Sequence, residues 1–176
     1  MAILSYAQWM PVKTKQEARR SGANPKGLVL HITSSRNNTL GGILSTFSPG
    51  GSNPFPSHFG IQTDGRIGQF IDTKYHDWAE EWSTNYISVE CSASPGDSLT
   101  YAQLFSVGYL YAWLVTEYNV PLDVANKPGD SGLGYHSMGK TGHKLCPGIN
   151  VIQQRSTILS IAQYMLTYSA SPATIP

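Results

Sequence analysis

The order of apolar and polar residues predicts strands in the first half of the chain and long helices in the second. Residues 27–33 (GLVLHIT) form a nearly continuous apolar run, which is typical of a central strand buried on both faces. In residues 86–91 (YISVEC) apolar side chains alternate with Ser88 and Glu90, so this strand has one apolar face and Glu90 lies on the other. Residues 58–71 predict a hairpin, because the Asp-Gly pair at their centre supplies the positive φ angles of a tight turn.

Apolar residues recur at helical spacing further along the chain. Residues 98–120 have the length and apolar density of a core helix, with Ser98 as its expected cap, and residues 151–168 predict a second long helix. Shorter helices are expected within 14–20 and 40–47. Because strands precede long helices, the pattern favours an α/β fold, with a mixed central β-sheet flanked by helices.

The length of the chain, 176 residues, fits a single domain, since a domain near this size buries roughly 70% of the surface that its unfolded chain exposes. We expect residues 1–168 to form that domain. Residues 169–176 (SASPATIP) are small, polar and proline-bearing, which is typical of the start of a linker.

Charge and hydropathy exclude two classes of partner. Twelve basic and eleven acidic residues give a net charge of +1 without a basic patch, so no nucleic-acid partner is expected. No apolar run approaches the roughly 20 residues that cross a bilayer, and the N-terminus lacks the apolar core of a signal peptide. We expect a monomer that is synthesised in the cytoplasm and does not insert into a membrane.

Three side chains of metal-binding type stand out. His31 lies near the carboxyl end of the buried strand, where α/β folds often carry site residues, although alone it is better explained as a core histidine. His136 and Cys146 lie in residues 134–148, a glycine-rich loop where core packing does not explain them. Two neutral imidazoles and one thiolate would bind Zn²⁺ and leave a fourth position for water, as in catalytic zinc sites.

A hydrolytic zinc site also needs a proton acceptor and a partner for the developing oxyanion. Glu90 and Lys144 are side chains of the required types. A disulfide between Cys91 and Cys146 is the alternative role for the second thiol. It is disfavoured because the cytosol keeps thiols reduced and because Cys91 shares the apolar parity of its strand.

Four ordered blocks carry a resemblance to a known family. They are residues 28–35 (LVLHITSS), 56–71 (PSHFGIQTDGRIGQFI), 84–93 (TNYISVECSA) and 136–148 (HSMGKTGHKLCPG). They resemble the type 2 N-acetylmuramoyl-L-alanine amidases, zinc enzymes that include phage lysozyme-amidases, AmpD-type recycling amidases and peptidoglycan recognition proteins. In AmpD-like members, the last block has a ligand histidine, a lysine eight residues later, and a cysteine or aspartate ligand two residues after that.

The resemblance implies a role for each candidate residue. His31, His136 and Cys146 would be the ligands of one zinc ion. Glu90 would be the catalytic base and Lys144 would stabilise the oxyanion. Other branches have a tyrosine at the position of Ser57, and its absence here favours Glu90 as the base.

The expected substrate contacts are less specific. Residues 75–82 (YHDWAEEW) are a loose counterpart of the family's substrate-binding segment, so His76, Trp78 and Trp82 either contact substrate or cover the core as surface side chains. His143 either contacts substrate, competes for zinc or is a solvated loop histidine.

The implied function is zinc-dependent hydrolysis of the amide bond between N-acetylmuramic acid and L-alanine in bacterial peptidoglycan. We expect the catalytic domain of a phage endolysin, which reaches the cell wall when it is released at host lysis and which a wall-binding domain would follow. The alternatives are a cytoplasmic amidase that recycles muropeptides and a non-catalytic peptidoglycan-binding module. The presence of Cys146 argues against the binding module.

Overall fold

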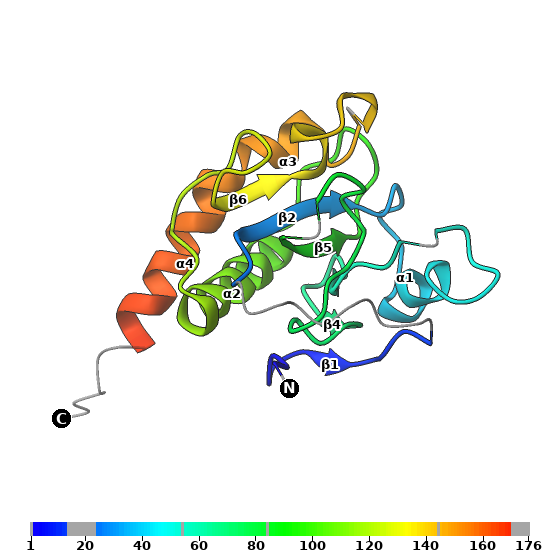
Figure 1. The fold of residues 1–176 in the computed structure, drawn as a ribbon, viewed down its shortest axis with the longest axis horizontal. Coiled ribbons are helices and arrows are strands. Elements are labelled where there is room, and N and C mark those ends of the chain that lie inside the picture. The colour runs from blue at the N-terminus through cyan, green and yellow to red at the C-terminus, as the bar shows by residue number, and fades with distance from the viewer. Residues whose placement is uncertain (1, 14–23, 54, 84, 144, 170–176) are drawn as a thin grey trace.

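The fold is a six-stranded mixed sheet with helices on both faces (Figure 1), which confirms the predicted fold class. The computed structural model describes residues 2–13, 24–53, 55–83, 85–143 and 145–169. The strands are β1 (Gln8–Trp9), β2 (Gly27–Ile32), β3 (Phe59–Ile61), β4 (Ile67–Gln69), β5 (Ile87–Cys91) and β6 (Gly132–Tyr135). Their order is β1-β4-β3-β5-β2-β6, and β3, β5, β2 and β6 run parallel to one another.

The helices of the described chain are α1 (Leu40–Thr46), α2 (Tyr101–Tyr118), α3 (Ile149–Gln153) and α4 (Arg155–Ser169), with two short 3₁₀ turns, η1 (His136–Met138) and η2 (Thr141–His143). Thr100 caps α2 and forms a reciprocal capping box with Gln103, so the prediction of Ser98 as the cap was wrong. The long helix expected over 151–168 is interrupted at Gln154, where α3 ends and α4 begins.

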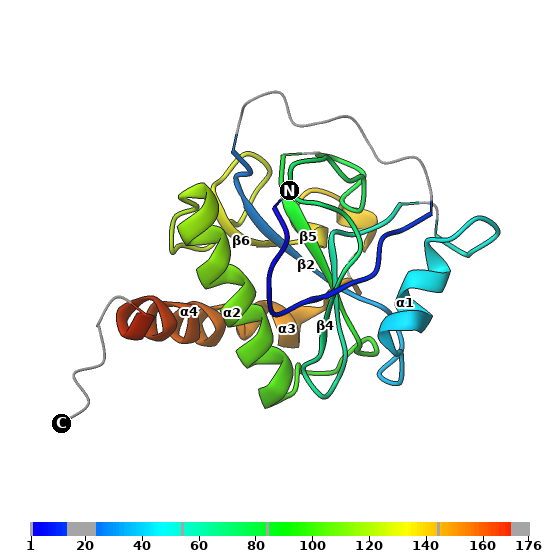
Figure 2. The same ribbon diagram turned by 90° about the horizontal axis from the view of Figure 1, so that it is seen from below.

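Apolar side chains of the two central strands form the main core together with α2 and α4. In β5 these are Ile87, Val89 and Cys91, all fully buried, as the alternation predicted. Figure 2 shows α2 and α4 side by side on one side of the sheet, and α1 on the other. On the α1 side, Ile43 and Phe47 pack on Phe70 in a smaller core.

Two strands had no counterpart in the sequence prediction. The edge strand β1 pairs with β4 over only two residues. At the opposite side, β6 begins beside Gly27, where the β2 backbone lies so close that an added Cβ would meet the Gly132 carbonyl oxygen. The helix expected within 14–20 lies outside the described residues, as do residues 170–176 of the expected tail.

The parallel arrangement determines where polar chemistry can gather. The carboxyl ends of β5, β2 and β6 meet at one edge of the sheet, and ligand sites of α/β folds usually lie there. None of the helices in the described part of the chain combines the length and apolar character needed to span a bilayer.

Candidate active site

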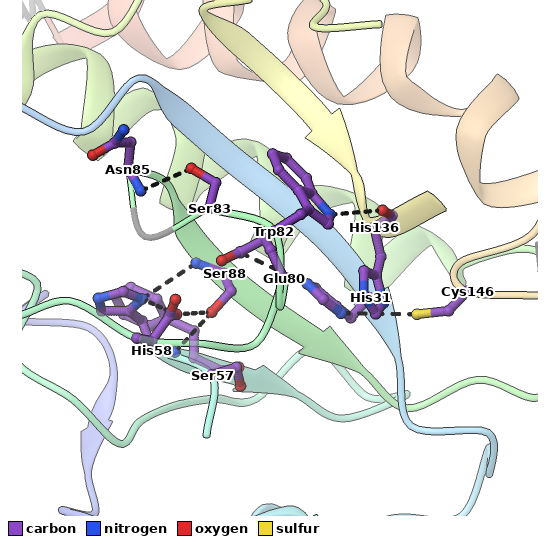
Figure 3. Close-up of polar contacts among 12 residues, drawn as sticks. His31, Ser57, His58, Glu80, Trp82, Ser83, Asn85, Ser88, His136 and Cys146 are labelled. Atoms are coloured by element: carbon purple, nitrogen blue, oxygen red, sulfur yellow. Dashed lines mark hydrogen bonds and ion pairs between the residues drawn. The ribbon is translucent and has the colours of Figure 1, made fainter. Parts of the chain in front are cut away.

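The carboxyl ends of three neighbouring strands bring the candidate ligands together. His31 is the penultimate residue of β2, and His136 follows the last residue of β6 directly. Cys146 comes from the loop that returns to α3. The ligand atoms of these three residues lie within 4.8 Å of one another. His31 Nδ1 is 3.8 Å from Cys146 Sγ (Figure 3), and the two imidazole rings have centroids 4.3 Å apart.

Both histidines are buried and uncharged, which suits them to bind a metal ion. His31 is 2% exposed and His136 is 5% exposed. Burial lowers the pKa of His31 well below its ordinary value, and the neighbouring imidazoles add to the effect. Burial, with His143 close by, lowers the pKa of His136 to about 4. Neither ring nitrogen of His136 has a hydrogen-bond partner. Buried polar atoms rarely remain unsatisfied in a folded protein, so these nitrogens indicate a ligand site.

Cys146 faces the histidines as a half-buried thiol. The Ile32 amide donates to its sulfur over 3.5 Å, and the Ser137 amide donates to its carbonyl oxygen over 3.2 Å. Burial and the nearby Glu90 raise the pKa of the thiol. Cys91 lies in the core, and both cysteines are unbonded, so the structure does not contain the alternative disulfide.

Glu90 lies beside this ligand set because of strand register. It is the direct partner of His31 across the parallel β2–β5 pair, and both side chains project from the face opposite α2. Glu90 is 9% exposed, and burial raises the pKa of its carboxyl group to about 7. A carboxyl group with a pKa near neutrality is suited to accept and return a proton.

The site opens into a pocket of about 290 Å³, whose lining includes His31, His136, Cys146 and Glu90. A second pocket of about 200 Å³ shares Glu90 with the first and extends over the uncharged side chains of Asn38, Thr46 and Ser52. A larger pocket, of about 460 Å³, lies between the β3–β4 hairpin and α2, and its lining contains no histidine or cysteine. The ligand set therefore occupies a two-part groove, with Glu90 at the junction.

Comparison with known proteins agrees with this geometry. Residues 21–149 match the family model described as N-acetylmuramoyl-L-alanine amidase. The chain belongs to the N-acetylmuramoyl-L-alanine amidase family. No curated protein matches it at a significant level of sequence similarity.

Solved structures share the fold of this amidase family member at low sequence identity. A selenomethionine AmpD crystal structure has a TM-score of 0.70 at 21% identity, covering 90% of this chain and 96% of that one. The hydrolase AmiA of Staphylococcus aureus, in complex with its ligand, has a TM-score of 0.71 at 17% identity, covering 95% and 87%. The PlyG catalytic domain has a TM-score of 0.65 at 18% identity, covering 95% and 99%.

The segment after β4 supports the amidase site in a way that sequence analysis missed. Glu80 is fully buried, and its Oε1 is 3.7 Å from His31 Nε2, the ring nitrogen on the side away from Cys146 (Figure 3). This separation is too long for a hydrogen bond, so the carboxylate acts on the outer nitrogen of His31 through its charge and favours one orientation of the ring. The only sequence signal is the acidic pair in AEEW, and nothing in that pair marks Glu80 as buried.

Trp82 supports the other histidine instead of lining the pocket. Its indole Nε1 donates to the His136 carbonyl oxygen over 3.1 Å, and its ring lies against Gly139. The pocket lining likewise includes neither His76 nor Trp78, and the Trp78 side chain is exposed. Of the expected substrate contacts, His143 alone lines the pocket. Lys144, the expected partner of the oxyanion, lies outside the described residues.

A buried polar cluster anchors this supporting segment to β5. Asp77 forms an ion pair with His58 and accepts a hydrogen bond from Ser88, and His58 Nε2 donates to the Tyr75 carbonyl oxygen over 3.0 Å. Burial raises the pKa of Asp77, but the charge of His58 and the hydrogen bonds from His58, Ser88 and Glu80 together outweigh burial and leave the pKa lowered. The anchored Asp77 precedes Glu80 by three residues, so the cluster fixes the point from which Glu80 reaches His31.

Proposed function

We propose that the chain is a zinc-dependent hydrolase that cleaves the amide bond between N-acetylmuramic acid and L-alanine in peptidoglycan. One observation carries the proposal. His31, His136 and Cys146 converge within 4.8 Å in an open pocket, with Glu90 alongside. Family membership supplies the reaction class.

The donor set fits zinc. Two imidazoles and one thiol are the nitrogen and sulfur donors that Zn²⁺ prefers, and three protein ligands leave one coordination position open to the pocket. The unpartnered nitrogens of His136 lie inside this set. The lowered pKa values keep both imidazoles neutral, which metal binding requires. Zinc, when bound here, would supply Lewis acidity to the scissile carbonyl and increase the acidity of water.

The protein side chains carry the proton chemistry. Glu90 accepts the proton of the attacking water and returns it to the leaving nitrogen, and its pKa of about 7 suits both steps. The Glu80 carboxylate, 3.7 Å from His31 Nε2, favours one orientation of that ring. We assign Lys144 to the oxyanion of the tetrahedral intermediate, because a cation is required there.

The biological setting that we propose is phage-induced lysis of the host cell. Residues 1–168 would act as the catalytic domain of an endolysin, with residues 169–176 as the start of a linker to a wall-binding domain. The runner-up is a recycling amidase, which would act on soluble muropeptides instead of intact walls.

The experiment is digestion of purified peptidoglycan followed by mass spectrometry. We expect stem peptides with a new L-alanine amine, glycan strands without new reducing ends, and about one zinc per chain. Chelation should stop the reaction and zinc should restore it. New reducing ends, or full activity in metal-free protein, would overturn the proposal. Faster release from intact walls than from soluble muropeptides favours the endolysin, and the reverse favours recycling.

A further inference from the structure

A second set of metal-binding side chains shares His136 with the first. The ligand atoms of Glu81, His136 and His143 also lie within 4.8 Å of one another. We call these three the outer set, and His31, His136 and Cys146 the inner set. The His136 ring lies between the other two, with centroids 4.3 Å from His31 and 4.5 Å from His143.

The two sets differ in their access to solvent. His31 and His136 are buried, whereas Glu81 is exposed and His143 is half-buried. All four line the same pocket of about 290 Å³. A cation that enters this pocket from solvent therefore meets the carboxylate of Glu81 and the imidazole of His143 before it reaches the inner set.

His136 makes the two sets alternatives for one ion. A single neutral imidazole binds one metal ion, so the two sets are not filled together. Neither ring nitrogen of His136 makes a well-formed hydrogen bond, so both remain available to a metal ion. An ion can pass from one set to the other by a short movement about this ring while the remaining ligands exchange.

Lys140 competes for the outer set. Its ammonium pairs with Glu81 Oε2, and the two side chains are 38% and 30% exposed. An ion pair of this exposure is weak, so a divalent cation can displace the ammonium. The outer set should therefore hold metal less tightly than the inner set, as a transient site must.

We propose that the outer set captures a divalent transition-metal ion from solvent and delivers it to the inner set. This proposal rests on the zinc centre proposed above. Capture raises the local concentration of the ion beside the inner set and turns the second step into an intramolecular transfer. Loading should then proceed in two steps, and its rate should saturate as the metal concentration rises.

The test is rapid mixing of metal-free protein with Co²⁺. Charge-transfer absorption between thiolate and cobalt marks arrival at the inner set, because the outer set has no sulfur. We expect saturating kinetics in the unmodified protein. His143→Gln and Glu81→Gln should load about tenfold more slowly at low Co²⁺, with a rate linear in Co²⁺ and the same final absorption. Lys140→Met should load faster. His76→Gln and Glu117→Gln are matched controls, outside both sets, and should load as the unmodified protein does.

The outcomes distinguish a failure of metal capture from a failure of the zinc centre. If no thiolate–cobalt absorption develops in the unmodified protein, the zinc centre itself fails. If the absorption develops at the same rate in His143→Gln, Glu81→Gln and the controls, the zinc centre stands and capture is overturned. An equilibrium arm is independent of rates: Cys146→Ser should retain weak Co²⁺ binding that the added His143→Gln change reduces. Equal binding by the single and double variants would also overturn capture.

Discussion

At the scale of single residues, burial beside His31, His136 and Cys146 sets the acid–base properties of Glu90. Burial raises its pKa to about 7, so the carboxyl group is close to half-protonated in neutral solution. Glu90→Gln has nearly the same size and removes only the titrating group. We expect unchanged folding and zinc content, with turnover reduced by roughly two to four orders of magnitude, the usual contribution of a positioned acid–base group. Turnover near that of the unmodified enzyme would move the base elsewhere.

Substitutions of Cys146 distinguish a metal ligand from a structural thiol. Cys146→Asp keeps an anionic donor, with a zinc–oxygen bond about 0.1–0.3 Å shorter than the zinc–sulfur bond, so it should retain metal and part of the activity. Cys146→Ala removes the donor, and both metal and activity should be lost. Cys91→Ala changes a core side chain and should leave the zinc content intact. Zinc analysis and activity under reducing conditions compare the three. Equal loss in Cys146→Asp and Cys91→Ala would reject the ligand assignment.

Metal affinity should depend on pH through Cys146. Burial raises the thiol's pKa, so the thiol is protonated near neutrality, whereas the lowered pKa values keep His31 and His136 neutral. Zinc needs the thiolate, so binding near pH 7 should release about one proton from Cys146 and a further fraction from the half-protonated Glu90 beside the ion, and affinity should rise at least about tenfold per pH unit until the thiol ionises. The slope should steepen further below the His136 pKa of about 4. Calorimetry in buffers of different ionisation enthalpy counts the proton. Release of no proton contradicts this assignment.

At the scale of elements, the turn after β6 depends on one glycine. A Cβ added to Gly139 would come within 2.3 Å of the Trp82 ring, whereas one added to Gly142 would meet nothing within 4 Å. Gly139→Ala should displace either Trp82 or the turn that carries His136. We expect zinc affinity to fall roughly tenfold or more, the usual effect of disturbing a ligand's support. Gly142→Ala, in the same loop, is the matched control, and competitive zinc titration measures both. Equal affinities would show that the Trp82 contact does not position His136.

The elements that sequence predicted are those in which apolar spacing decides the outcome. The strands near 27–33 and 86–91 are fully buried, and the helix near 98–120 packs on them. By contrast, β6 (GLGY) contains little apolar signal, and its pairing with β2 depends on close backbone approach. The break between α3 and α4 was missed because Gln154 exchanges two hydrogen bonds with the backbone of Leu99, a partner that helical periodicity does not reveal.

At the site, too, sequence revealed the residues with a specific pattern and missed those whose role depends on tertiary contacts. His31, His136 and Cys146 were predicted as a ligand set because their residue types and spacing match metal chemistry and a family pattern, and the structure brings them together. Glu80 was not, because a carboxylate becomes a supporting group only through burial beside His31, which is a tertiary contact. For Trp82 the sequence left two roles open, substrate contact or cover of the core, because substrate-binding and supporting aromatics look alike in sequence.

At the scale of the whole molecule, one metal ion would join three separate parts of the chain: β2, the start of η1 and the loop before α3. An ion that binds only the folded state stabilises it by about 4 kcal/mol at a free concentration a thousand times its Kd. For a chain of this length, that corresponds to a rise in Tm of roughly 10 °C. Thermal unfolding with zinc, with chelator, and in Cys146→Ala tests this. A Tm that does not respond to zinc in the unmodified protein would contradict the cross-linking role.

The register of β2 and β5 fixes two site residues independently of the loop that borders the neighbouring pocket. Main-chain hydrogen bonds of two central strands set His31 opposite Glu90, independently of any loop. The neighbouring pocket is bordered by Ser52 and Asn53, in the connection between α1 and β3. Replacing this connection would reshape the neighbouring pocket and leave His31 and Glu90 paired. The residues that pair at the site and those that border the neighbouring pocket thus belong to separable parts of the chain.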